Sequence, residues 1–256
     1  MTLTTILDAG FWGLVAGLGL FLGALAGYYM KLRHREIATI MGFGGGVLIS
    51  ILSFDLVEKA YVQAGFEIAA IGFLAGGIVF STANWLLAKI GAQHRKRCGE
   101  CVQQPGEEEH PGSGLSLFLG ALVDGIPESL VIGLSLIGGG VIHFTTIAGF
   151  FLANVPQGLS SSSGMKDAGR SSRYVLGVWG GLALASGIAA VLGYGVLGGF
   201  PADTIALMSA FAAGGLLAML TETMIPEAFH RASAFIGLIT VIGFLAAFVM
   251  LKTGLH

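Results

Sequence analysis

The chain has 256 residues, of which 54% are hydrophobic and 11% are charged, with a formal net charge of −2 and a mean hydropathy of +0.83. A soluble domain of this length carries roughly twice that share of charged residues, so the composition predicts an integral membrane protein surrounded by lipid bilayer. The small negative charge gives no basis for a nucleic-acid partner.

Apolar runs close to the roughly 20 residues that a helix needs to cross a bilayer recur along the chain. Because the runs are continuous and do not alternate, they predict helices and not the strands of an outer-membrane barrel. We expect one all-α membrane domain over residues 1–256, an eight-helix bundle with a cytoplasmic loop at 91–113. The helices are predicted at about 11–30, 37–58, 66–90, 114–137, 144–165, 174–197, 204–228 and 231–252.

The thirteen Lys and Arg residues are distributed unevenly between the two sides of the bundle. All except Lys59 and Lys252 flank the connections between helices 1 and 2, 3 and 4, 5 and 6, or 7 and 8. Basic residues collect on the cytoplasmic side, so this bias places both termini on the extracytoplasmic side. The residues that carry the bias are Lys31, Arg33, Arg35, Lys89, Arg95, Lys96, Arg97, Lys166, Arg170, Arg173 and Arg231.

Many of the 42 glycines are spaced by four residues within the predicted helices. This spacing places small residues on one helix face and lets two helix backbones approach closely in lipid. We therefore predict tight helix packing at these positions. The series are Gly19, Gly23 and Gly27, then Gly42 and Gly46, Gly72 and Gly76, and Gly177 and Gly181.

The second predicted helix carries two acids near its outer end, Asp55 and Glu58. They are three residues apart and so share a helix face. One interpretation is an entrance that attracts cations. The other is a pair of interfacial charges beside Lys59.

The loop at 91–113 contains a single CxxC motif, Cys98 and Cys101, flanked by His94 and His110 and followed by the acids Glu107 to Glu109. Cytoplasmic thiols stay reduced, so capture of a metal is chemically plausible and a disulfide is not expected. One CxxC supplies only half of a zinc site, and a solvated linker is the competing interpretation.

The fourth predicted helix carries Asp124, Pro127 and Glu128 near its middle. An ionisable residue inside the bilayer costs roughly 2.5–3.5 kcal/mol even on the mildest scale, so it usually faces a partner, water or a substrate. The two carboxylates are four residues apart and share a helix face. Pro127 also frees the carbonyl of Val123 as a further oxygen. These features predict a cation site.

The fifth predicted helix repeats this design with uncharged groups. Asn154, Gln157 and Ser161 share one face around Pro156, and further serines surround them. Their oxygens are candidate ligands. The alternative is that amides and serines join helices by hydrogen bonds within the bundle. The further serines are Ser160, Ser162 and Ser163.

The seventh predicted helix places Glu222 and Glu227 toward the cytoplasm, beside Pro226 and close to His230. They are candidates for an exit site. Glu227 has an alternative partner in Arg231 at a spacing of four residues. The two acids are five residues apart and would share a face only if Pro226 bends the helix.

The candidate ligands at the centre are all oxygens, and no histidine lies in a predicted membrane core. Oxygen ligands suit harder ions such as Mn, Mg or Ca better than Zn. No motif indicates use of ATP, and we expect a protein that is not an enzyme. An intramembrane hydrolase built on the serines is disfavoured, because no histidine is placed to activate them.

The segments DGIPES at 124–129 and ANVPQGLSSSSGMK at 153–166 resemble the fourth and fifth helices of the ZIP (Zrt/Irt-like) divalent-metal transporters. The resemblance extends over the whole chain in helix count, topology and loop placement. With the prolines aligned, Asp124 stands where the family usually has His, and Glu128 matches its Glu. Gly125 replaces Asn. On the fifth helix, Ala153 replaces His or Gln, Asn154 replaces an acid and Gln157 replaces Glu.

The resemblance implies an inverted 3+2+3 helix arrangement, a homodimer as one form of assembly, and the plasma (inner) membrane of a prokaryote. It implies inward transport of a divalent cation, zinc by family default with Mn, Fe or Cd as alternatives. Since only two charged ligands remain at the centre, we expect one bound ion and not two. A metal sensor or a transport-inactive relative is the competing interpretation.

Overall fold

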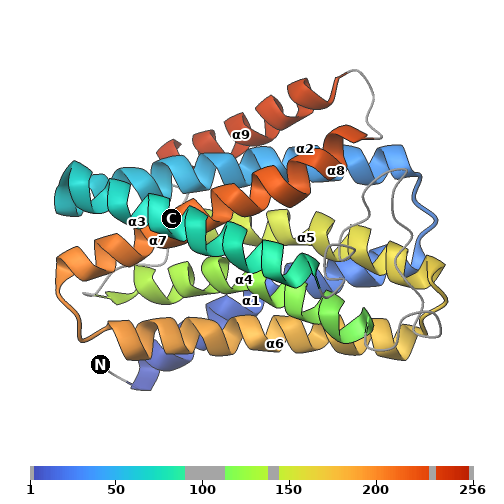
Figure 1. Cartoon of the computed structure of the whole chain (residues 1–256), viewed down its shortest axis with the longest axis horizontal. Helices are drawn as coiled ribbons and strands as arrows, with labels where there is room; N and C mark the ends of the chain where they lie inside the picture. The colour runs from blue at the N-terminus through green and yellow to red at the C-terminus, as the bar shows by residue number, and fades with distance from the viewer. Residues whose placement is uncertain (1–2, 90–112, 138–143, 231–234, 254–256) are drawn as a thin grey trace.

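The structure is a computed structural model that describes residues 3–89, 113–137, 144–230 and 235–253. These residues are almost all helical, and no strand occurs among them, as the apolar runs predict (Figure 1). Segments η1 and η4 are π-helical. The elements are α1 (Leu3–Tyr29), α2 (His34–Ile51), η1 (Leu52–Val57), α3 (Glu58–Ala88), α4 (Ser113–Ser135), α5 (Phe144–Asp167), α6 (Ser172–Leu197), α7 (Ala202–Met219), η4 (Leu220–Met224), α8 (Ile225–His230) and α9 (Ile236–Thr253).

Within the described part of the chain, six helical stretches are long and apolar enough to cross a membrane. This finding indicates a membrane protein, as the composition predicts. Helix α5 is not among the six, because its Asn, Gln and Ser residues lower its hydropathy. The stretches are Leu3–Tyr29, Arg35–Leu87, Phe118–Ser135, Ser172–Leu197, Ala202–Phe229 and Ile236–Thr253.

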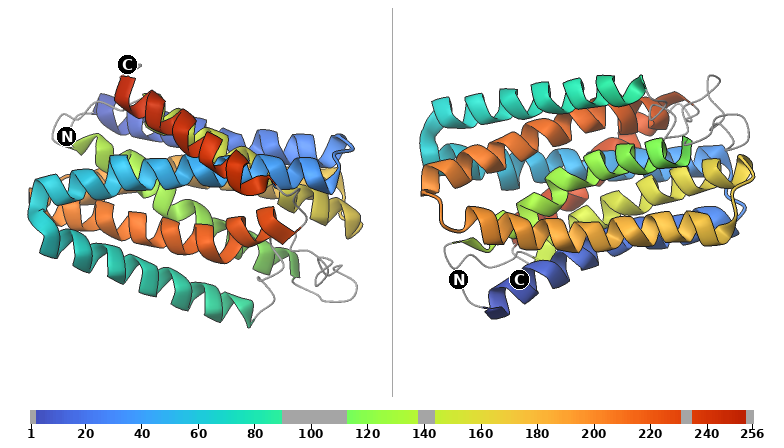
Figure 2. Two further views of the ribbon diagram at one scale, coloured as in Figure 1. Left: turned by 90° about the horizontal axis from the view of Figure 1, so that it is seen from above. Right: turned by 60° about the horizontal axis from the view of Figure 1, so that its bottom comes forward.

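The long stretch Arg35–Leu87 contains one break in its helical geometry, at Gly65. Gly65 has φ 81° and ψ 176°, a conformation that glycine adopts without the steric cost of a Cβ. The chain turns back there, so that the rest of α3 returns past α2 toward the opposite end of the bundle (Figure 2). The predicted boundary between helices 2 and 3 falls at this turn.

The helices form two groups by their mutual packing. In one group, α1 packs against α5 and α6, and α4 packs against α6. In the other, α3 packs against α7, and α2 packs against α8 and α9. The groups meet where α5 touches α2 and α4 touches α7. Helices α4 and α5 therefore lie between the remaining helices, and both carry predicted site residues.

Glycines allow several of these helix pairs to approach closely. A methyl group at Gly19, Gly23 or Gly27 of α1 would collide with a backbone carbonyl of α5. The same holds for Gly46 of α2 against α9, and for Gly76 of α3 against α7. The spacing of these glycines therefore has the packing role that the sequence predicts.

The pair Gly177 and Gly181 on α6 does not take part in such packing, so the prediction is wrong for these two. A Cβ at Gly177 would meet nothing within 4 Å, and one at Gly181 would make an ordinary contact with the Phe118 side chain at 4.0 Å. Glycine spacing alone does not tell which face of a helix meets a neighbour.

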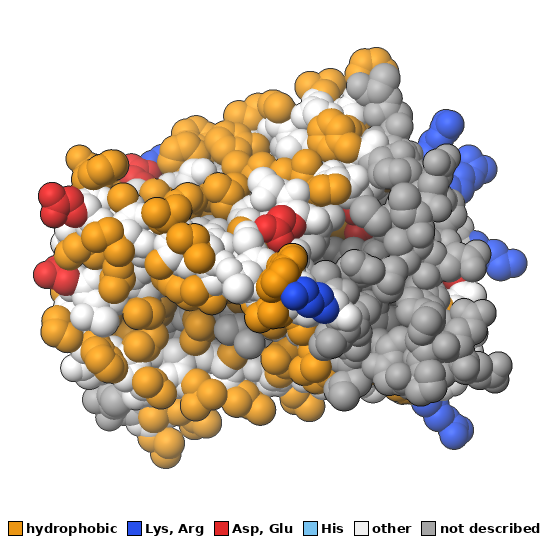
Figure 3. Space-filling view, in the orientation of Figure 1, with side chains coloured by type: hydrophobic (Ala, Val, Ile, Leu, Met, Phe, Trp, Pro, Cys, Tyr) orange, Lys and Arg blue, Asp and Glu red, His pale blue; other side chains and the backbone are white. Residues whose placement is uncertain are grey.

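Most of the charged side chains visible in Figure 3 lie toward the ends of the bundle, and the face between them is mainly hydrophobic. Most of the Lys and Arg side chains visible in this view lie at the end where α1 leads into α2 and α5 leads into α6. The first residue of α1 and the last of α9 lie toward the other end (Figures 1 and 2). This separation of charge matches a helix bundle embedded in lipid.

Candidate cation site

The predicted central residues come together between α4 and α5. Asp124 and Glu128 lie near the middle of α4, and Asn154 and Gln157 near the middle of α5. The two carboxyl side chains are each 2% exposed and the two amides each 4% exposed. Each helix contains its proline, Pro127 or Pro156, beside these residues. The structure thus buries four polar side chains within an apolar bundle.

Gln157 connects the members of this cluster. Its Nε2 donates to Glu128 Oε1 at 3.5 Å and to Asn154 Oδ1 at 3.4 Å. Asn154 Nδ2 in turn donates to the backbone carbonyl of Ala16 on α1 at 3.1 Å. The close glycine contact between α1 and α5 brings this carbonyl within reach. Asn154 is therefore held in place by the backbone of α1. Gln157 is held less firmly, because its hydrogen bonds are longer.

A small cavity of about 10 Å³ lies beside Asp124. Its polar lining consists of Asp124, Gln157 and Ser161, together with Trp179 of α6. Ser161 is 2% exposed and lines the cavity together with Asp124 and Gln157. Its position in the sequence predicts that it shares a helix face with Gln157. Trp179 is the residue that the sequence did not single out, since a tryptophan in an apolar helix carries no pattern that marks it.

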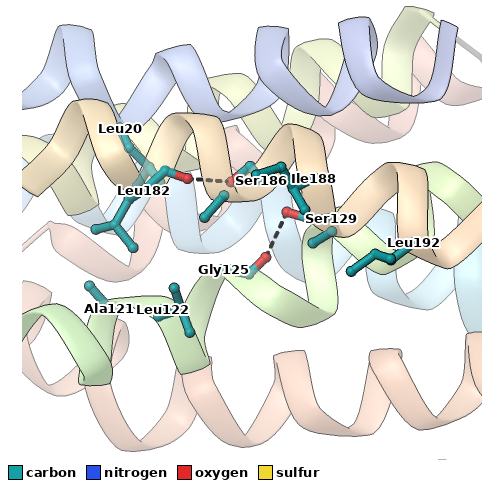
Figure 4. A pocket seen from close by; sticks show the side chains of 11 residues that line it. Leu20, Ala121, Leu122, Gly125, Ser129, Leu182, Ser186, Ile188 and Leu192 are labelled. Carbon is teal, nitrogen blue, oxygen red and sulfur yellow. Dashed lines mark hydrogen bonds between the residues drawn. The ribbon is translucent and has the colours of Figure 1, made fainter. Parts of the chain in front are cut away.

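A larger, half-open groove of about 220 Å³ runs beside this cavity between α4 and α6 (Figure 4). The groove and the cavity share Leu20, Ala121 and Gly125 in their walls. The two serines of the groove are satisfied by their own helices, since Ser129 Oγ donates to Gly125 O and Ser186 Oγ to Leu182 O. The groove is therefore an apolar surface, and the polar groups point into the small cavity and the cluster around Gln157.

The two acids predicted at an outer entrance have different surroundings. Asp55 in η1 is 7% exposed, forms an ion pair with Lys59 and accepts a hydrogen bond of 2.6 Å from Thr146 Oγ1. Glu58 is exposed and lies 3.7 Å from the Lys252 ammonium. These contacts favour the interpretation of charges paired near the interface over an open entrance for cations.

The two inner acids point in different directions. Glu222 in η4 is exposed and accepts hydrogen bonds of 2.5 Å from Ser81 and Asn84 of α3. Glu227 in α8 is 6% exposed and accepts a hydrogen bond from Ser160 of α5. The two acids therefore contact two different helices, α3 and α5. They do not form one exit site in this structure.

Several predicted residues lie outside the part of the chain that the structure describes. The CxxC loop with His94, Cys98, Cys101 and His110 falls between 89 and 113, and Arg231 follows α8. His230 ends α8, and the placement of its side chain is not described.

The central cluster offers oxygen atoms from two carboxylates, two amides and a hydroxyl. Such a set suits a divalent cation that prefers oxygen ligands. Among the described residues, no group of three or more His, Cys, Asp or Glu side chains is placed to hold a metal ion. A cation at the centre would therefore depend on the amides, the hydroxyl, backbone carbonyls or water in addition to its two carboxylates.

Neither a scan against models of protein families nor a search of curated proteins found a match to this chain.

Proposed function

We propose that the protein carries a divalent metal cation across the membrane through the site formed by Asp124, Glu128, Asn154 and Gln157. The observation that carries the proposal is the burial of two carboxylates, each 2% exposed, near the middle of a helix that contains a proline. Burial of charge is costly unless an opposite charge binds. A cation arriving with two positive charges would offset both carboxylates.

The partners of these carboxylates support a site that binds and releases its ion. One donor to Glu128 is the neutral Gln157 amide, at the long distance of 3.5 Å. An amide that rotates offers its oxygen to a cation and, in the absence of the ion, its N–H groups to the carboxylates. Rotation of the Gln157 amide therefore suits both a loaded and an empty state of the site.

The proposed path requires eight crossings, with both termini on the extracytoplasmic side. Two features support this count: the turn at Gly65 divides Arg35–Leu87 into two arms, and α5 packs between α1 and α2. The polar α5 is thereby enclosed by other helices, where its amides do not meet lipid.

The pattern of helix contacts supports an inverted 3+2+3 arrangement. In such an arrangement α1 corresponds to α6, and α4 corresponds to α5. The contact of α1 with α5 then corresponds to the contact of α6 with α4, and both are present. Likewise α2 corresponds to α7, and α3 corresponds to α9. The contact of α2 with α9 then corresponds to the contact of α7 with α3, and both are present. The corresponding helices α2 and α7 are also each followed by a π-helical segment, η1 and η4 respectively. Transporters built from such repeats bind their substrate at the repeat interface.

Zinc is the substrate that the resemblance to ZIP transporters implies, with Mn, Fe or Cd as alternatives. The all-oxygen ligand set favours the harder ions within this group. The net inward direction, the plasma (inner) membrane of a prokaryote and a homodimer belong to the same proposal, and they rest on the resemblance and on the distribution of basic residues.

The test is uptake of Mn, Fe, Zn, Cd and Mg ions into proteoliposomes by the wild type, Asp124→Asn and Glu128→Gln. We expect uptake of at least one transition metal by the wild type, and a loss of about 100-fold or more in both variants, because each variant removes a charged ligand. Asp203→Asn is the matched control, since Asp203 is an exposed acid in the first turn of α7.

A metal sensor or transport-inactive relative is the second candidate function. It is favoured by the presence of Asn154 and Gln157 where the resemblance expects acids. Wild-type flux at background, with cation binding intact, would overturn the carrier and support the sensor. Absence of both binding and flux would overturn both functions.

A further inference from the structure

Trp179 is a buried residue of α6 whose indole N–H makes no hydrogen bond to any residue that the structure describes. The side chain is 2% exposed and packs with Leu20, Met165 and Val175. A buried N–H without an acceptor costs free energy, and native proteins leave few of them. An acceptor other than the described residues is therefore expected near this indole.

Trp179 also lines the cavity beside Asp124, together with Gln157 and Ser161. The volume of about 10 Å³ is close to the least that accommodates one water molecule. A buried water needs two to four polar partners, and the residues that line this cavity carry a carboxylate, an amide, a hydroxyl and the indole N–H. The rest of its lining, Leu20, Ala121 and Gly125, offers no competing side-chain group.

We propose that this cavity holds one water molecule that accepts the Trp179 N–H and stays bound to the cation at Asp124, so that Trp179 selects for a partly hydrated divalent cation. The water in the cavity follows from the orphaned donor and the polar lining. Its role as a ligand of the ion rests on the proposed function.

The chemistry explains why water, and not the bare ion, faces the indole. The hydrogen of an N–H group carries partial positive charge and repels a cation. A water oxygen has two lone pairs, so it binds the cation with one and accepts the indole hydrogen with the other, while its hydrogens donate to Asp124 or Gln157 oxygens. The indole thus stabilises the hydrated ion and not the bare one.

This arrangement predicts an order among metals. Mg²⁺ gives up its water ligands reluctantly and usually keeps several of them in protein sites. Zn²⁺ is commonly bound by four ligands and exchanges water for protein groups more readily. Loss of the Trp179 hydrogen bond is therefore expected to weaken binding of Mg²⁺ more than binding of Zn²⁺.

The first test follows the indole N–H resonances of the wild type in ¹H–¹⁵N spectra. The chain has three tryptophans, and Trp12 and Trp85 act as internal references because they lie outside the cavity. Addition of Mg²⁺ is expected to shift the Trp179 resonance and leave the other two in place, and Asp124→Asn is expected to abolish the shift. An unchanged Trp179 resonance, with Mg²⁺ binding detected by calorimetry, would overturn the inference.

The second test compares Trp179→Phe, which keeps a ring and removes the N–H, with Trp12→Phe, which makes the same change away from the site. We expect Trp179→Phe to weaken Mg²⁺ binding by about three- to tenfold, the worth of one hydrogen bond, and Zn²⁺ binding by less than about twofold. Equal affinities of Trp179→Phe and wild type for Mg²⁺ would overturn the inference and leave the proposed function standing.

The two tests distinguish failure of this inference from failure of the proposed function. Wild-type protein that binds neither Mg²⁺ nor Zn²⁺ would overturn the proposed function together with the inference. If Trp179→Phe does not fold, as judged by circular dichroism and size-exclusion chromatography, the spectra of the wild type decide the question without it.

Discussion

Two acids buried in this bundle are compensated in different ways. Asp55, in the π-helical segment η1, is paired with the Lys59 ammonium and accepts from Thr146. Glu128, in the middle of α4, accepts from the neutral Gln157 amide at 3.5 Å. The first carboxylate already has a cation from the protein itself. The second lies among groups that can also bind a cation from outside.

The comparison teaches that an acid in an apolar helix is not by itself a substrate site. In the sequence, Asp55 and Glu128 both appear as carboxylates within long hydrophobic segments. Their partners separate them: a lysine one helical turn away on the same chain segment, or an amide from another helix. A carboxylate with a lysine partner is a weaker candidate for a cation site than one that accepts from a neutral amide.

The largest expected effect is on cation binding, where Glu128 and Asp55 should differ most. Glu128→Gln is expected to weaken the affinity for the preferred cation by about 100-fold, because it removes one of two charged ligands. Asp55→Asn is expected to change that affinity by less than about threefold, since the two sites are separate. Isothermal titration calorimetry in detergent measures both. Equal losses in the two variants would show that Asp55 belongs to the binding path and would break the comparison.

A smaller effect is expected when the packing of α1 against α5, which supports the central amides, is disturbed. Gly23→Ala places a methyl group against Val155 O of α5, so the free energy of unfolding should fall by about 1–3 kcal/mol. Gly177→Ala meets nothing within 4 Å and should leave stability unchanged or raise it by about 0.5–1 kcal/mol, because alanine favours helix over glycine. Thermal unfolding in detergent compares them. A Gly177→Ala variant as unstable as Gly23→Ala would contradict the packing described for α1 and α5.

The smallest effect concerns the outer pair. Lys59→Met leaves the Asp55 carboxylate with Thr146 but without its ammonium, and should lower the free energy of unfolding by about 1–2 kcal/mol. This value is below that of a fully buried pair because Lys59 is 53% exposed. The double variant Lys59→Met/Asp55→Asn should recover most of the loss. A single variant as stable as the wild type would show that Lys59 does not compensate Asp55.

The sequence predicts the all-helical, apolar character of the chain and the helix faces that its polar residues share, for reasons that are local. Apolar runs set the helix ranges, and spacings of three and four residues place Asp124 with Glu128, and Asn154 with Gln157. The meeting of these two faces could be expected only through the resemblance between α4 and α5 and the helices of a known family. The turn at Gly65 could be located because both flanking segments are long and apolar.

The remaining features depend on packing between helices that are distant in sequence. Gly177 has the same spacing pattern as Gly23, yet only Gly23 meets a neighbouring backbone. The spacing of Glu222 and Glu227 predicts different helix faces, but only packing shows that they meet α3 and α5. Trp179 is recognisable only once its N–H is found without an acceptor beside Asp124. No pattern along the chain carries this information.

The unequal lengths of the helices have a consequence for the surrounding lipid. At 1.5 Å per residue, α1 with 27 residues extends about 40 Å, whereas α9 with 18 residues extends about 27 Å. A hydrocarbon layer about 30 Å thick accommodates the longer helix by tilting and the shorter one by thinning at its ends. Hydrophobic mismatch therefore acts in opposite senses on α1 and α9, which belong to different packing groups. Bilayer thickness is therefore a mechanical variable for this protein, separate from the chemistry of its ligands.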